Sequence, residues 1–131
     1  MRYRALFLAA AVVTAILAVP VRAHHSHVNY AVSTFTLLEG TVKEVQYINP
    51  HSWIYVEVKS SSGEPEIWAL ESTTPTGLER RGITRDFVRV GDPVKVRCHR
   101  HRDNSNGCLL GFLTPMHGDA ARGHGVEKEW D

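Results

Sequence analysis

Between residues 36 and 113 the chain consists of short stretches in which apolar and polar positions alternate, the pattern of strands with one buried face. The clearest stretch is Trp53 to Lys59, where Ile54, Val56 and Val58 fall on one face. In the preceding stretch, residues 36–48, Gly40 and a slip in the alternation around Lys43-Glu44 predict a bulge or a bend. Together the pattern predicts five strands, over residues 36–48, 53–59, 66–71, 94–101 and 108–113.

One short helix is expected among these strands. Thr74-Pro75 has the residue types of a helix cap followed by proline at the first helical position, and Gly82 is a typical stop. Three strands, a short helix and two strands is the order found in a five-stranded barrel of the OB type, with the helix between strands three and four. We therefore expect an all-β, OB-like barrel domain over residues 36–114, with an open sheet or a sandwich as the competing architecture. Residues 115–131, rich in glycine and poor in apolar residues, are expected to form a loose tail.

The first 23 residues have the features of a cleaved export signal. Arg2 and Arg4 precede an apolar run over residues 5–19, and small residues stand before a cut site after Ala23. The apolar run is shorter than the roughly 20 residues that a membrane span needs, which favours a cleaved signal over a retained anchor. We expect a periplasmic or secreted protein with no membrane contact after cleavage. Its mature chain would begin at His24, in a His-rich arm over residues 24–35.

Removal of the signal changes the charge of the protein. Three arginines leave with it, so the 15 Lys and Arg of the chain fall to 12, against 14 Asp and Glu. This balance lacks the concentrated basic face that nucleic-acid or anionic-membrane binding needs, and neither partner is expected.

Cys98 and Cys108 belong to that exported portion, where oxidising conditions allow a disulfide. They lie on the last two expected strands, on either side of a turn over residues 103–107, and would be cross-strand neighbours. We predict that they form a disulfide. The alternative is that the two thiolates ligate copper beside His99.

Six motifs in fixed order also resemble a known family. The order of these motifs, over roughly residues 24–113, resembles the bacterial exported family catalogued as domain of unknown function 6152. The resemblance implies a small exported β-domain and no particular activity, since that family is functionally uncharacterised. The motifs are His24-His25-Ser26, Leu38-Glu39-Gly40-Thr41-Val42, Asn49-Pro50-His51-Ser52-Trp53, Trp68-Ala69-Leu70-Glu71, Leu78-Glu79-Arg80-Arg81-Gly82 and Gly91-Asp92.

The strongest candidate for chemistry is a metal site at the mature N-terminus. The α-amine and the ring of His24 can chelate one ion, and His25 or His27 can add an imidazole to the planar nitrogen array that copper(II) accepts. His51 is the natural rigid partner if the arm folds back across the barrel mouth, which resembles the histidine brace of copper proteins. We expect copper first and zinc second. The competing interpretation is a solvated His-rich tip that binds metal adventitiously, with His51 bonded to its own loop.

His99 and His101 form a weaker candidate. Two positions apart on one strand, they make a half-site for zinc. The cationic side chains of Arg97 and Arg100 beside them oppose a dication, which favours a solvated edge without metal.

An aromatic face supplies the alternative from another class of function. Trp53, Tyr55 and Trp68 are expected to share the face opposite the aliphatic residues of the second and third strands. Exposed, they would form a stacking platform for a glycan or a protein partner, although such residues more often pack beneath a covering segment.

The sequence contains no nucleophile elbow, zinc-protease motif or phosphate loop, so an enzyme is the minority interpretation, with a copper-brace oxidase as its one concrete form. We expect an exported domain that binds a transition metal for delivery, sensing or storage and exchanges it with another exported protein. The alternative is an accessory binding module that uses the aromatic face.

Overall fold

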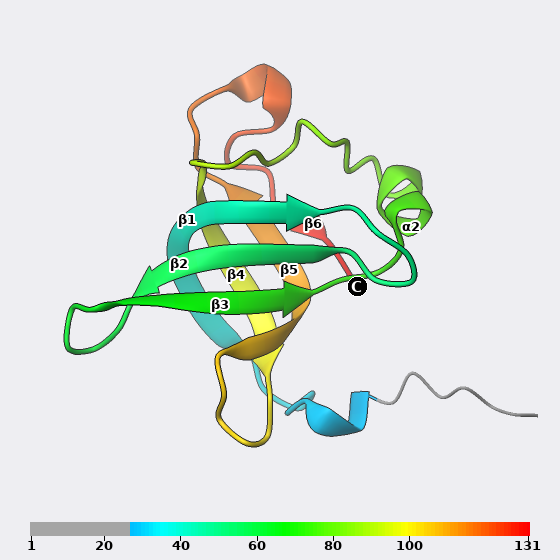
Figure 1. The fold of residues 1–131 in the computed structure, drawn as a ribbon. Coiled ribbons are helices and arrows are strands. Elements are labelled where there is room, and N and C mark those ends of the chain that lie inside the picture. The colour runs from blue at the N-terminus through cyan, green and yellow to red at the C-terminus, as the bar shows by residue number, and fades with distance from the viewer. Residues whose placement is uncertain (1–26) are drawn as a thin grey trace, which may run out of the picture.

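In the computed structural model, which describes residues 27–131, the barrel is organised around one long strand, β1 (Thr36–Gln46). β1 pairs antiparallel with β2 (Trp53–Lys59) along one edge and with β4 (Pro93–Arg100) along the other. β2 also pairs antiparallel with β3 (Pro65–Glu71), and β4 pairs antiparallel with β5 (Gly107–Pro115). A parallel pairing of β3 with β5 closes the ring, as Figure 1 shows. The OB-like five-stranded barrel predicted from the sequence is confirmed.

β1 serves both halves of the barrel because it bends. Its residue Gly40 lies so close to β2 that a Cβ atom there would stand 2.2 Å from the carbonyl oxygen of Glu57. The pairing register with β2 then shifts between Val42 and Glu44, which confirms the predicted bulge. A glycine and a bulge together allow the strand to turn from one partner to the other.

The core fills the inside of this barrel with alternate residues of each strand. Ile54 and Val56 of β2 are fully buried, as the alternation predicted. Trp130, from the far end of the chain, is also fully buried among them. The buried cluster comprises Leu38, Val42, Ile54, Val56, Trp68, Leu70, Leu78, Ile83, Phe87, Val88, Val94, Val96, Cys98, Cys108, Leu110, Leu113 and Trp130.

The one α-helix among residues 27–131, α2 (Pro75–Arg80), lies between β3 and β4, as the sequence predicted. The hydroxyl of Thr74 accepts a 3.0 Å hydrogen bond from the backbone N–H of Gly77, which caps the helix start. Gly82 follows the helix with a positive φ of 69°, a conformation that favours glycine. Leu78 is buried, so the helix adds an apolar side chain to the core at this end of the barrel.

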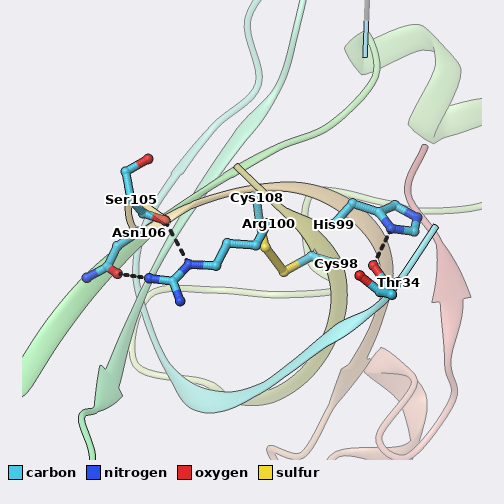
Figure 2. The surroundings of a disulfide bond; sticks show 7 residues. All are labelled: Thr34, Cys98, His99, Arg100, Ser105, Asn106 and Cys108. Atoms are coloured by element: carbon cyan, nitrogen blue, oxygen red, sulfur yellow. Dashed lines mark hydrogen bonds between the residues drawn. A yellow bond between two sulfur atoms is a disulfide. The ribbon is translucent and has the colours of Figure 1, made fainter. Parts of the chain in front are cut away.

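Cys98 and Cys108 form a disulfide between β4 and β5, with a Cα–Cα distance of 5.6 Å. Figure 2 shows this bond and the residues around it. The predicted pairing is confirmed. Both cysteines are buried, so the bond links the last hairpin from within the core.

The described part of the N-terminal arm is attached to the barrel. A short 3₁₀ helix, η1 (His27–Asn29), is followed by Tyr30, which is buried and forms a β-bridge with His101. In Figure 1 this segment lies beside the turn between β4 and β5. His24, His25 and the expected export signal lie outside the described residues.

The C-terminal segment differs from the loose tail that its composition suggested. It contains a 3₁₀ helix, η2 (Ala120–Arg122), and a short strand, β6 (Lys128–Glu129), which pairs with β5. Trp130 follows β6 and enters the core, where its ring lies 6.2 Å from that of Phe87. One large apolar side chain fixes the end of the segment even though the residues before it are mostly polar and small.

Within residues 27–131, the structure contains no helix that is both long and apolar enough to pass through a membrane.

Candidate functional site

A pocket of about 470 Å³ opens where the arm passes the end of the barrel. Five parts of the chain meet there: the arm, the turn before β2, the end of β3 with the residues leading to α2, β5, and the C-terminal residue of the sequence. The pocket is lined by His27, Asn29, Tyr30, Pro50, His51, Glu71, Ser72, Thr73, Thr74, Leu109 and Asp131.

The turn that carries His51 is held rigidly against the end of β3. The backbone N–H of Ser52 donates to the carbonyl of Thr73 at 2.9 Å, and the N–H of Ser72 donates to the carbonyl of Ser52 at 2.9 Å. The buried Ser72 hydroxyl in turn donates to the carbonyl of Trp130 at 2.5 Å. The C-terminal segment thereby supports the backbone on which this side of the pocket is built.

His51 directs one ring nitrogen to two acceptors. Its Nδ1 lies 3.1 Å from Oε1 of Glu71 and 3.2 Å from the backbone carbonyl oxygen of Ser72. A carbonyl or a carboxylate oxygen accepts a hydrogen bond and cannot donate one, so the hydrogen belongs on Nδ1 of His51. In a neutral ring the lone pair then lies on Nε2.

Glu71 also contacts the arm. The hydroxyl of Tyr30 donates a short hydrogen bond to Oε2, the second oxygen of the same carboxylate. Burial of the phenol, and then the hydrogen bond and negative charge of Glu71, raise the pKa of Tyr30 well above its usual range. Tyr30 therefore stays neutral and remains a donor to Glu71 at physiological pH.

Backbone contacts hold the arm against the last hairpin and so fix the place of His27. The N–H of Tyr30 donates to the carbonyl of His27 at 2.9 Å, and the N–H of Ala31 donates to the carbonyl of Arg100 at 2.8 Å. The N–H of Arg102 donates to the carbonyl of Asn29 at 2.9 Å. His27 and His51, far apart in sequence, consequently line one pocket.

The described residues place two of the predicted metal ligands, His27 and His51, at one pocket. His27 and His51 supply imidazoles to the pocket, and Glu71 and Asp131 supply carboxylates. Within residues 27–131, no group of three or more His, Cys, Asp or Glu side chains has an arrangement that could hold a metal ion. The other predicted ligands, His24 and His25, lie outside the described residues.

The weaker candidates, His99 and His101, each have a separate environment. Nδ1 of His99 lies 2.8 Å from the carbonyl oxygen of Thr34, and its ring stacks on Phe35 at a centroid distance of 4.4 Å. Figure 2 shows His99 directed toward Thr34, away from Arg100. Nδ1 of His101 lies 3.0 Å from the hydroxyl of Ser105. Because both cysteine sulfurs are in the disulfide, thiolate ligation of copper beside His99 is not available in this state.

The prediction that Trp53, Tyr55 and Trp68 share one face of the sheet is wrong for Trp68. Trp68 pairs in register with Val56, so both side chains point to the same side of the sheet, and Trp68 is buried in the core. Trp53 and Tyr55 lie on the other side of the sheet, where both are partly buried. The three side chains do not form one platform.

Tyr30 and Glu71 are the residues of this pocket that sequence reasoning missed. Glu71 ends the alternating strand Pro65–Glu71, and Tyr30 stands in a segment without period, so no local pattern connects them. They are 41 positions apart, and only closure of the barrel and seating of the arm bring them together. The one available signal was that Glu71 is the last residue of the family motif Trp68-Ala69-Leu70-Glu71.

Comparison with known proteins yields one family. The model of a family of unknown function, DUF6152, matches residues 11–110. Neither the curated proteins nor the solved structures gave a significant match.

Proposed function

Because the chain belongs to the DUF6152 family, whose description assigns no activity, we propose a function from its own residues: an exported domain that binds a transition metal, copper before zinc. The ligands are the amine and ring of His24, the rings of His25 and His27, and the ring of His51. The domain delivers, senses or stores the metal and exchanges it with another exported protein.

One observation carries this proposal: His27 of the arm and His51 of the turn before β2 line the same pocket. A site at the mature N-terminus requires that a residue of the arm share a pocket with an imidazole held by the barrel, and His27 and His51 meet that requirement.

The length of the chain supports the remaining ligands. His24 stands three positions before His27, and an extended chain covers at most about 3.6 Å per residue. The amine of His24 is thus within about 11 Å of the arm residue that lines the pocket. The pocket, at about 470 Å³, has room for an ion with several side-chain ligands.

The types of donor favour copper. Imidazole and amine nitrogens suit copper(II), which accepts four nitrogen ligands in a plane, and zinc accepts the same imidazoles in a tetrahedron. Glu71, hydrogen-bonded to Nδ1 of His51, is the kind of partner that orients a metal-binding histidine and increases its basicity.

The amine is available only if the export signal is removed after Ala23, and the first experiment addresses that step. We propose to purify the exported protein without a tag, determine its first residue, and titrate it with copper(II) against a competing chelator. A second protein with one alanine before His24 keeps every side chain and removes the chelating amine from the ring of His24.

We expect the added alanine and the substitution His51→Ala each to weaken copper(II) affinity by more than about 100-fold, beyond the loss typical of a residue one shell away from the metal. His99→Ala is the matched control, because His99 is a histidine of β4 that does not line the pocket. Affinities equal to that of the unmodified protein in both test proteins would refute the proposal. An accessory binding module would then be the remaining explanation.

Proton competition provides a second test. Metal ligation requires neutral imidazoles and a deprotonated amine, and imidazoles in general take up protons near pH 6.5. Copper affinity is expected to fall as the pH is lowered through about 7 to 6. An affinity that stays constant down to pH 4 would contradict ligation by histidine.

A further inference from the structure

Glu71 contacts both parts of the chain that contribute to the pocket. Oε1 of its carboxylate lies 3.1 Å from Nδ1 of His51, on the turn before β2. Oε2 accepts the hydrogen bond from the hydroxyl of Tyr30, on the arm. One side chain thus connects the arm to the histidine held by the barrel.

The Glu71 carboxylate is largely shielded from solvent, and its two oxygens contact His51 and Tyr30. The Glu71 side chain is 20% exposed, and among residues 27–131 the one ion pair that it forms is with His51. Two donors that approach opposite oxygens fix the plane of the carboxylate. Loss of either donor leaves the other with a less well-oriented partner.

We propose that Glu71 is a positioning residue that couples seating of the arm, through Tyr30, to the orientation of the His51 ring. When the arm is seated, the phenol fixes Glu71, and Glu71 holds the hydrogen on Nδ1 of His51 so that Nε2 is the ligating atom. This inference rests on the proposed function, because it assigns His51 as a metal ligand.

The coupling explains why the tyrosine is buried next to a carboxylate. Tyr30 is only 6% exposed and has its ring 4.6 Å from that of His101, so its position is determined by packing as well as by the hydrogen bond. Its hydroxyl is therefore directed at Glu71 whenever the arm is in place. Placement of the arm on the barrel therefore also sets the orientation of the His51 ring.

The test is a set of copper(II) affinities, measured with copper(II) alone by chelator competition on the protein that begins at His24. Tyr30→Phe removes the hydroxyl and keeps the ring, and Glu71→Gln keeps the shape and removes the charge. We expect each to lower the affinity by about 10- to 100-fold, the range typical of partners that orient a metal-binding histidine. Tyr55→Phe and Glu57→Gln, the same changes on β2 outside the pocket, should leave the affinity unchanged.

The decisive comparison repeats the two substitutions in protein that already carries His51→Ala, whose N-terminal ligands still bind copper(II). If Tyr30 and Glu71 act through His51, each substitution changes the affinity less than about twofold in that background, because coupled residues are not additive. Equal losses in both backgrounds would overturn the inference and assign Tyr30 and Glu71 to seating of the arm alone.

Two further outcomes separate this inference from the proposed function. If His51→Ala weakens binding while Tyr30→Phe and Glu71→Gln bind like the unmodified protein, the metal site stands and the inference falls. If His51→Ala binds like the unmodified protein, both fall.

Glu71→Gln should also change the copper(II) hyperfine splitting in the electron paramagnetic resonance spectrum, whereas an unchanged splitting would contradict a role in ligand orientation.

Discussion

Trp130 offers the sharpest test of how the C-terminal segment contributes to the barrel. Its side chain is fully buried, and its backbone N–H donates to the carbonyl of Gly111 at 2.8 Å. Replacement by alanine removes the indole and keeps the backbone bonds. Substitutions of a buried Trp or Phe by Ala typically cost about 3–5 kcal/mol, because apolar burial is lost and a cavity remains.

The indole N–H adds a discriminating detail. Among the described residues, Nε1 of Trp130 has no hydrogen-bond partner. Trp130→Phe therefore removes volume without breaking a hydrogen bond, and its cost should be less than half that of Trp130→Ala. A domain with a total stability of about 5–15 kcal/mol would tolerate the first change far better than the second.

Urea unfolding followed by far-ultraviolet circular dichroism measures both effects. At an m value of about 1.5–2 kcal/mol/M, Trp130→Ala should lower the midpoint by roughly 1.5 to 3 M. Val126→Ala is the control, since Val126 belongs to the same segment and is 48% exposed; it should change stability by less than about 0.5 kcal/mol. A loss below about 1 kcal/mol for Trp130→Ala would refute the assignment of this segment to the core.

Three further predictions follow from buried or paired groups. Burial and Glu71 raise the pKa of Tyr30 above the value near 10 of an unfolded tyrosine, so the free energy of unfolding should fall as the pH rises above about 10. Tyr30→Phe should reduce that fall, and an equal dependence of the unfolding free energy on pH in the two proteins would contradict the raised pKa of Tyr30. Burial of Asp92 opposes its ionisation, but hydrogen bonds from Arg122 and from the N–H of Arg89 outweigh this effect and lower the pKa of Asp92. Asp92→Asn should therefore destabilise the protein at pH 7, by an amount that shrinks as the pH falls below about 4. Simultaneous replacement of Cys98 and Cys108 by alanine opens a loop of sequence separation 10 and should lower the free energy of unfolding by about 2–3 kcal/mol, whereas an unchanged urea midpoint would show that the disulfide does not constrain the unfolded chain.

The barrel was accessible from sequence because its signals are local. Alternation marked the buried faces of the strands, and Thr74-Pro75 with Gly82 marked the helix. Trp68 was assigned to the wrong face of the sheet. Alternation within one strand tells which of its residues share a face, but it does not tell which face of the neighbouring strand lies on the same side. The register between β2 and β3, which pairs Trp68 with Val56, decides this, and that register depends on the turn between the two strands.

The C-terminal segment and the pocket were less accessible because their contacts are distant in sequence. Trp130 is one apolar residue after a polar, glycine-rich stretch, and its destination in the core depends on a barrel closed elsewhere. Tyr30, His51 and Glu71 converge only after β1 has bent and β3 has paired with β5. The histidines could be chosen by chemistry, but the carboxylate that joins His51 to the arm could not.

The central claim is that the ring of His51 binds a metal ion together with the mature N-terminus. Pulsed electron paramagnetic resonance on the protein beginning at His24, loaded with one equivalent of copper(II), detects the remote nitrogen of each bound imidazole. We predict that the modulation from bound imidazoles decreases by the contribution of one ring in His51→Ala and stays the same in His99→Ala. Identical spectra from the unmodified protein and His51→Ala would contradict the claim.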